Sequence, residues 1–522
     1  MNSLFLSALV ISSLTTTPVN RQFEVSEPVS INIETEQLSY FRGVLSSDKP
    51  LKSAVIRNPG GQVIKSLLAE GEQESEIYWL APGPNDYLLE IHPFEQQAAQ
   101  ISLELTTLKL KDDQTVSPPQ ELISPLLLSA RSDITAGKAG ALKKFWQQIE
   151  RSGTPLVEPA NDGRLLVTFL WRGEAANVRV LGSPYDGHSH LSRLPDSDIW
   201  YKSYTVPDDA RFSYRIAPDV PQLDPSQLAP NSYEQRRAVL ATSQADPLNH
   251  QPQFANEDTR FGTASTLTLP KAAKDEMALE HGNPPGSVTH YRYHSASLNN
   301  DRSISIYTPN EKYALTPQAP LLILFDGEAY LGRVPTPTIL DNLIAQQKIP
   351  VMRAVFINNP LPSLRGKELT PNTEFADFMA REFKPYLCQV HQICPAAKDT
   401  ILSGSSFGGL ASLAIALQYP EAFGKVLSQS GSFWWRQDGE DDLWITQRLN
   451  DQSKKNIEIY LNAGVFEQGS SDSGILQTNR TAYAELKKQG YSVTLQEVSG
   501  GHDYFSWRFM LSQGLIQLFK HQ

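Results

Sequence analysis

Between Ser287 and the C-terminus, short apolar runs alternate with segments of helical spacing, and this alternation most restricts the fold. The runs are RSISIYTP, PLLILFDG, VMRAVFINNP, DTILSGS, KVLSQSGS, IEIYLNAG and VTLQEVSGG. Parallel strands need a crossover connection, usually a helix, so strands separated by helices indicate βαβ units. The sequence therefore predicts an α/β domain over residues 280–522, built on a mostly parallel sheet.

One turn in this region has the form of a nucleophile elbow. Residues 404–408 read Gly-Ser-Ser-Phe-Gly, between an apolar strand-like run and the helical segment LASLAIALQ. The glycines Gly404 and Gly408 allow a strand and a helix to approach closely around a strained turn, which exposes the middle serine at the top of the sheet. Ser406 is therefore the predicted nucleophile. The N–H of Phe407, at the helix N-terminus, is a predicted donor to an oxyanion.

A serine hydroxyl needs a base, and in this fold the chain order is serine, acid, histidine. His502 is the one histidine after Ser406 outside the C-terminal tail, and it follows the run VTLQEV and two glycines. The acid should follow the preceding run, IEIYL. Glu467 is preferred there because a carboxylate a few residues past the strand can reach back to the histidine. Asp472 is the competing candidate, and Asp503 is disfavoured because sequence neighbours usually point apart.

A second oxyanion donor is expected in the loop after the run PLLILF. That loop reads Phe325-Asp326-Gly327-Glu328. In this fold the second N–H comes from the loop after the third strand. Gly327 allows the backbone to bend toward Ser406, so the N–H of Gly327 or of Glu328 is the predicted donor.

Two β regions precede this domain. Residues 21–112 contain short alternating runs bounded by turn residues, as in a β-sandwich, and the sequence does not indicate their role. Polar and proline-bearing residues predict a linker over 113–140. Residues 141–270, with the runs LLVTFLWRG, NVRVLGS, IWYKSYTV and FSYRIAP, predict a second β-sandwich. The expected fold is thus an α/β-hydrolase C-terminal domain preceded by two β-sandwich domains.

The N-terminus carries an apolar run, LFLSALVISSL, within residues 1–20. It is too short to span a bilayer, which takes about 20 residues, but it fits the apolar region of a secretory signal. No Lys or Arg precedes it and no clear cleavage site follows, so a buried first strand or helix is the alternative. We expect a periplasmic or secreted protein without a membrane span, with a cytoplasmic location as the alternative.

Charge and cysteine content exclude several function classes. The formal net charge of −11 repels phosphate backbones, so nucleic acid is not an expected partner. The two cysteines, Cys388 and Cys394, lack a zinc-type set of neighbours, and we expect them to form a disulfide if the protein is exported. The predicted serine chemistry needs no cofactor and no catalytic metal.

Several blocks resemble the enterochelin (enterobactin) esterases, within the esterase D group of α/β-hydrolases. The resemblance covers roughly residues 141–522, and residues 21 to about 125 lie outside it. Its blocks are LLILFDGEAY, GSSFGGLASL, YPEAFGKVLSQSGSFWW, YLNAGVFE, GGHDYFSWR and, in the second β region, VTFLWRG and FSYRI. The family's cytoplasmic members lack the front domain and an export signal.

The resemblance implies hydrolysis of the seryl ester bonds of a catecholate trilactone siderophore, usually as the iron complex. It places Ser406, His502 and Glu467 on the family's catalytic positions. A ferric tris-catecholate is an aromatic trianion, which requires cations beside aromatic faces. Candidates after strand ends or beside the predicted triad are Arg365, Trp434, Trp435, Arg436, Trp507 and Arg508.

Two other functions remain open from the sequence. A feruloyl or acetyl-xylan esterase would use the same triad, and β-sandwiches often accompany enzymes that act on glycans. A non-catalytic siderophore-binding protein is the alternative of another class, and the presence of all three triad residues argues against it.

Overall fold

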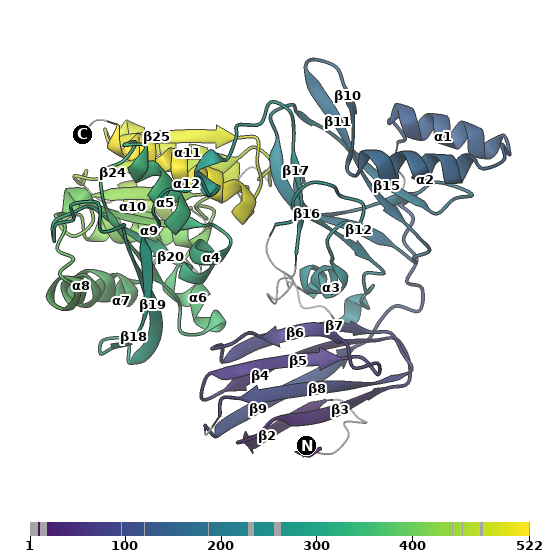
Figure 1. Ribbon diagram of the computed structural model, residues 1–522, viewed down its shortest axis with the longest axis horizontal. Coiled ribbons are helices and arrows are strands. Elements are labelled where there is room, and N and C mark those ends of the chain that lie inside the picture. The colour runs from purple at the N-terminus through teal and green to yellow at the C-terminus, as the bar shows by residue number, and fades with distance from the viewer. Residues whose placement is uncertain are drawn as a thin grey trace. The chain divides into compact units, whose positions relative to one another are not determined.

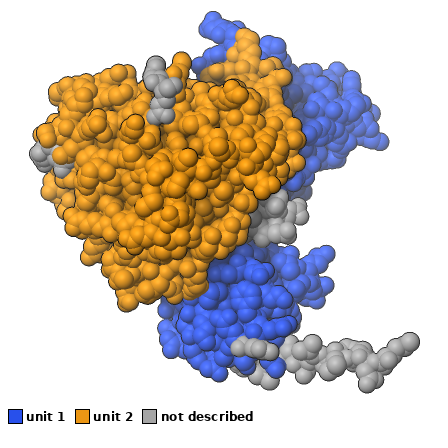
Figure 2. All heavy atoms as spheres, turned by 60° about the vertical axis from the view of Figure 1, so that its left-hand side comes forward, with its two compact units in different colours: residues 1–181, 187–205, 214–265 blue, residues 182–186, 206–213, 266–522 orange. Residues whose placement is uncertain are grey.

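A computed structural model shows the arrangement of the chain (Figure 1). It describes residues 9–10, 18–95, 97–118, 121–185, 187–227, 234–254, 263–437, 439–440, 442–450, 453–469 and 473–520. The expected signal segment therefore lies largely outside the described residues. The chain forms two compact units, coloured separately in Figure 2. One contains residues 1–181, 187–205 and 214–265, and the other contains residues 182–186, 206–213 and 266–522.

The first unit begins with a β-sandwich of two sheets. One sheet has the strands β1 (Leu9–Val10), β3 (Val29–Thr35), β8 (Asn85–Pro93), β5 (Leu51–Arg57) and β6 (Val63–Leu68), in that order. The other has β2 (Val19–Val25), β9 (Ala99–Leu108), β4 (Ser39–Ser47) and β7 (Glu74–Ala81). Apolar residues alternate along the strands, so one face of each sheet packs into a shared core that includes Phe41, Trp79 and Tyr87.

A second pair of sheets follows. One contains β10 (Leu156–Pro159), β11 (Arg164–Arg172), β15 (Ile199–Pro207) and β14 (Ser192–Arg193), and the other contains β13 (His188–His190), β12 (Val178–Gly182), β16 (Arg211–Pro218) and β17 (Ser265–Thr268). Helix α1 (Pro125–Thr135) lies within the stretch expected to be a linker, and it packs with α2 (Ala141–Ser152) around Leu127, Phe145 and Trp146. Helix α3 (Glu234–Thr242) precedes β17 in the chain.

The C-terminal part is built on an eight-stranded sheet. Its order is β18 (Ser287–Ser295), β19 (Asn300–Thr308), β21 (Arg353–Ile357), β20 (Leu321–Phe325), β22 (Thr400–Ser405), β23 (Lys425–Gln429), β24 (Glu458–Gly464) and β25 (Ser492–Val498). The pairs β18–β19 and β19–β21 are antiparallel, and the strands from β21 to β25 are parallel. The predicted α/β fold with two β-sandwich domains before it is confirmed.

Helices cover both faces of this sheet, as its wholly buried central strands require. They are α4 (Gly327–Gly332), α5 (Thr336–Ala345), α6 (Pro362–Glu368), α7 (Thr373–Asp377), α8 (Lys384–His391), α9 (Phe407–Gln418), α10 (Trp444–Asn450), α11 (Ile475–Lys488) and α12 (Tyr504–Phe519), with a π-helical turn over Phe378–Phe383. Among the described residues, no helix is long and apolar enough to cross a membrane. A disulfide joins Cys388 and Cys394.

Candidate active site

Ser406 lies on a sharp turn between β22 and α9. Its backbone has a φ of 58° and a ψ of −118°. Residues other than glycine rarely adopt a positive φ. Its N–H is held by the carbonyl of Gln429 on β23 at 2.9 Å. A Cβ at Gly404 would lie 2.9 Å from the backbone of Gly408, so only glycine fits where the strand meets the helix. The sequence thus forms the elbow expected for a serine nucleophile.

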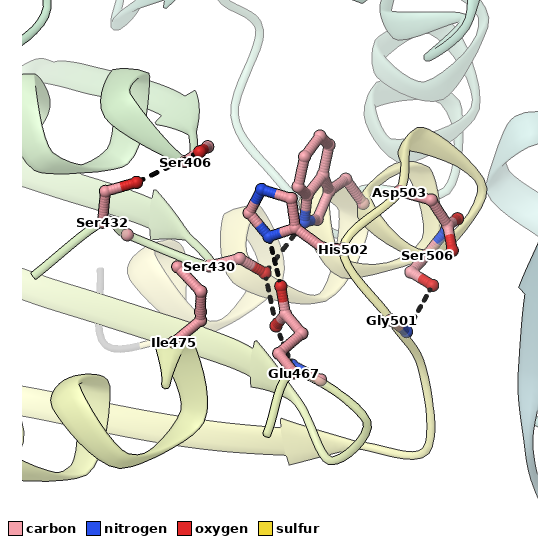
Figure 3. A network of polar contacts seen from close by, with 12 residues as sticks. Ser406, Ser430, Ser432, Glu467, Ile475, Gly501, His502, Asp503 and Ser506 are labelled. Carbon is pink, nitrogen blue, oxygen red and sulfur yellow. Dashed lines mark hydrogen bonds and ion pairs between the residues drawn. The ribbon is translucent and has the colours of Figure 1, made fainter. Parts of the chain in front are cut away.

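His502 and Glu467 are joined by a short hydrogen bond between His502 Nδ1 and Glu467 Oε1, at 2.5 Å. Glu467 follows β24 and its side chain is fully buried, whereas the His502 side chain, on the loop after β25, is 33 % exposed. Since Nδ1 faces the carboxylate, Nε2 is the nitrogen available for proton exchange with a serine. Figure 3 shows the imidazole of His502 between Glu467 and the side on which Ser406 lies.

The other oxygen of Glu467 is held by two further donors. Ser430 Oγ donates to Glu467 Oε2 at 2.8 Å, and the N–H of Gly464 donates to the same oxygen. Trp507 Nε1 donates to Ser430 Oγ at 2.9 Å. An indole N–H can only donate, so the single hydroxyl proton of Ser430 must point to Glu467. This chain of donors fixes the plane of the carboxylate that holds His502 (Figure 3).

The Ser406 hydroxyl contacts a second serine. Ser406 Oγ and Ser432 Oγ are 3.1 Å apart, and the N–H of Ser432 donates to the Ser406 carbonyl at 3.0 Å. Ser432 therefore supports the nucleophile from the loop after β23. The sequence carries the pattern Ser430-Gly-Ser432 after an apolar run, but two serines around a glycine also form ordinary turns, so the pattern alone does not indicate this role.

The loop after β20 can supply the second oxyanion donor. The N–H of Glu328 is engaged, since it donates to Asn358 Oδ1 at 2.9 Å. Of the two predicted donors, the N–H of Gly327 therefore stays the prediction. A Cβ at Gly327 would lie 2.8 Å from the Cβ of Phe356, so this close approach to β21 also requires glycine. Asp326, just before it, has a φ of 54° and accepts two hydrogen bonds from Arg365.

The loop that carries His502 is held by residues far away in sequence but within the same unit. The N–H of Arg211 donates to the Ser499 carbonyl at 2.9 Å, and the N–H of Ser213 donates to Asp503 Oδ2 at 3.3 Å. Gly501 packs so closely on Ser183 that an added Cβ would overlap the Ser183 hydroxyl. Residues 182–186 and 206–213, which the sequence assigns to the second β region, thus fix the backbone on both sides of the histidine.

Asp503, disfavoured as the catalytic acid, has a structural role. Its Oδ1 accepts from the N–H of Ser506 at 2.8 Å, which makes it the N-cap of α12. Burial raises the pKa of its carboxyl to about 6, and the negative charge of Glu467 adds to this rise. The competing acid Asp472 lies outside the described residues.

Comparison with known proteins agrees with this geometry. Residues 166–277 match the family described as enterochelin esterase, N-terminal, and residues 295–518 match the family described as putative esterase. An iron(III) enterobactin esterase of Dickeya dadantii is 30 % identical over 411 residues, which cover 71 % of this chain and 91 % of the relative. The chain belongs to the enterochelin esterase family.

Two further members of the enterochelin esterase family extend the match. An iron(III) enterobactin esterase of Escherichia coli O6:H1 is 30 % identical over 408 residues, which cover 74 % of this chain and 98 % of the relative. The crystal structure of the enterobactin esterase of Shigella flexneri in the presence of enterobactin superposes with a TM-score of 0.59, at 28 % identity, over 74 % of this chain and 99 % of that one. The resemblance predicted from the sequence is confirmed. The front sandwich, strands β2 to β9, lies outside both family matches.

Three of the residues predicted to bind the siderophore have internal partners in this enterochelin esterase. Arg365 forms a two-pronged ion pair with Asp326, and Arg508 pairs with Asp275, which also accepts from Arg211 at 3.0 Å. Trp507 is 4 % exposed and is part of the Glu467 network. The sequence could not show these partners, because each lies on a different element of the fold.

The other three candidates lie nearer the surface. Trp434 is half-buried, with its ring 5.8 Å from that of Phe407 beside the elbow. Trp435 is half-buried and packs on the apolar core. Arg436 donates to the Trp434 carbonyl at 3.2 Å. Trp434 thus contacts the first residue of the nucleophile's own helix, and the binding roles of these residues stay predictions.

Proposed function

We propose that this enterochelin esterase hydrolyses the seryl ester bonds of an enterobactin-like catecholate siderophore, with Ser406 as nucleophile. The observation that carries the proposal is the buried Glu467 bound to His502 Nδ1 at 2.5 Å beside the strained turn of Ser406. The names of the relatives and of the superposed structures supply the substrate class. The ferric complex is the proposed form of the substrate.

Each residue has one task in the reaction. His502 Nε2 accepts the proton of Ser406 as Oγ attacks the ester carbonyl, and Glu467 stabilises the resulting imidazolium. The N–H groups of Phe407 and Gly327 bind the oxyanion of the tetrahedral intermediate. As the C–O bond of the ester breaks, His502 protonates the departing seryl oxygen, which leaves as a hydroxyl, and the acyl group stays on Ser406. A water molecule, deprotonated by His502, releases the carboxylic acid and restores the serine.

The Ser406–Ser432 contact fits a resting state of this site. A hydroxyl bonded to a neighbouring serine must turn toward His502 before attack. Hydrogen bonds in catalytic sites are often long or differently paired before substrate binds. The 3.1 Å distance between the two hydroxyl oxygens is therefore compatible with the proposed role.

Product analysis tests the proposal. The wild-type protein is incubated with ferric enterobactin, with iron-free enterobactin and with a feruloylated sugar, and products are separated by mass. We expect the wild-type protein to release linear seryl esters from the siderophores. The rate of this hydrolysis should fall by a factor of about 10⁶ in Ser406→Ala and of about 10⁴ in Glu467→Gln. Release of ferulate without siderophore cleavage would favour the glycan esterase, and binding without turnover would favour a carrier.

We also propose that the protein works in an oxidising compartment. The disulfide between Cys388 and Cys394 supports this, because disulfides persist outside the reducing cytosol. Thiol titration of denatured, unreduced protein from its native compartment is the test. We expect no reactive thiols, and two thiols would contradict both the bond and the export.

A further inference from the structure

Arg179 on β12 is a buried cation without a counter-charge. The residue is 5 % exposed, and it forms no ion pair among the described residues. Its Nη1 donates to His188 Nδ1 at 2.9 Å, and its buried Nε has no hydrogen-bond partner. Charged side chains are almost never buried unless they are paired. Among the residues that the structure describes, this guanidinium therefore lacks the negative group that its burial requires.

Two histidines of the neighbouring strand β13 complete the cluster. Arg179 lies directly opposite His190 in the antiparallel pair β12–β13, so Arg179, His190 and His188 project from the same face. The Nδ1 of His190 is buried and also has no partner. Both imidazoles are only half-buried, so the cluster reaches the surface through them.

The histidines add donors and no negative charge. Arginine can only donate, so His188 Nδ1 is the acceptor and its proton is on Nε2, which leaves a second N–H in the cluster. Burial, and then the positive charge of Arg179, lower the pKa of each imidazole to about 4. The exposed Arg236 also acts on His188. In the described part of the chain no carboxylate pairs with Arg179, and burial lowers its pKa to about 10.

We propose that Arg179, His188 and His190 form a binding site for an oxyanion on the β12–β13 hairpin. A carboxylate, a catecholate or a sulfate oxygen would accept from the guanidinium and from the imidazole N–H, and would supply the missing negative charge. The proposal does not depend on the serine chemistry. In a chain of net charge −11, a buried guanidinium without a counter-charge is also where an anionic ligand would be held.

Thermal unfolding of the full-length chain with Ser406→Ala tests the site without turnover. Sodium sulfate and 2,3-dihydroxybenzoate are titrated against sodium chloride at constant ionic strength. We expect a saturable rise in Tm with at least one of the two anions, as for any ligand that binds the native state. Absence of a saturable rise with both would overturn the proposal.

Arg179→Met, added to Ser406→Ala, separates a ligand site from a structural arginine. In chloride alone we expect an unchanged or higher Tm, since an unpaired buried charge is removed. The affinity for the oxyanion should fall roughly tenfold to a hundredfold. The control is Arg151→Met, an exposed arginine at the end of α2, which should keep the response. A lower Tm in chloride with an unaltered anion response would assign Arg179 to folding alone.

A second variant keeps the test decisive if Arg179→Met does not fold. Arg179→Lys retains the charge but loses the planar fork, so we expect a folded protein that binds the oxyanion at least about tenfold more weakly. The source of the anion is then found by competition. If sulfate displaces ferric enterobactin from the Ser406→Ala protein, the siderophore supplies the oxyanion, and if it does not, the site takes a free anion.

Discussion

Arg365 donates from Nε and Nη2 to the two carboxylate oxygens of Asp326, at 2.6 and 2.7 Å. Asp326 directly precedes Gly327, the proposed oxyanion donor, and its backbone is in the left-handed region at a φ of 54°. A two-pronged pair of this kind restrains position as well as charge. Arg365, expected from the sequence to contact a catecholate, therefore acts first on the oxyanion loop.

Arg365→Ala should lower kcat on a small neutral ester as much as on the siderophore, by roughly tenfold to a hundredfold, since loss of one oxyanion donor costs about 10² to 10³. The measurement is kcat and KM on both substrates, with Lys367→Ala on the same helix as control. A rise in KM for the siderophore alone would contradict this prediction and would indicate that Arg365 contacts the catecholate directly.

Ser430→Ala should lower kcat by roughly tenfold to a hundredfold with little change in KM. The substitution removes one donor to Glu467 and leaves the buried N–H of Trp507 without its acceptor. Steady-state kinetics on a neutral ester measures the effect. Ser403→Ala is the matched control, because the buried Ser403 hydroxyl has no partner in the described part of the chain. Equal losses of kcat in the two variants would show that Ser430 does not position Glu467.

Asp503 should make the protein less stable as pH rises from about 4 to about 6. Its pKa is raised from 3.8 to about 6, so the folded state binds more protons than the unfolded state in that range, and stability falls as those protons leave. Asp503→Asn loses one acceptor at every pH but should remove this slope. Tm is measured for both proteins across this range, and parallel curves would contradict the prediction.

Gly501→Ala should destabilise the histidine loop, because the new methyl group overlaps the Ser183 hydroxyl. Overpacking of a tight contact typically costs about 1 to 3 kcal/mol. Ser183→Gly removes the obstructing atoms, so the double variant should recover both Tm and kcat in part. Recovery is the informative result, since a clash elsewhere in the loop would leave the double variant as impaired as Gly501→Ala.

The nucleophile elbow and the placement of Glu467 and His502 follow from local patterns, namely a strand, a turn and the chain order of the residues. The contacts that hold the His502 loop do not follow from local patterns. Arg211, Ser213 and Ser183 lie about 300 residues before it, and no local pattern pairs them with the loop. Likewise, the cation at Arg365 was visible in the sequence, whereas its partner Asp326 is fixed only when β20 and α6 are placed. Helix α1, within the expected linker, begins at the cap Ser124 followed by Pro125, and its apolar residues pack with those of α2.

Residues 182–186 and 206–213 belong to the unit that carries Ser406. An active catalytic domain therefore cannot be obtained by truncation at the boundary near residue 280 that the sequence predicts. A fragment beginning near residue 280 would retain the nucleophile, acid and base but would lack the backbone contacts that hold the histidine. Recombination between members of the family therefore has to carry both of these segments along with the C-terminal half. The segment that has to be exchanged as one piece is therefore larger than the C-terminal domain alone.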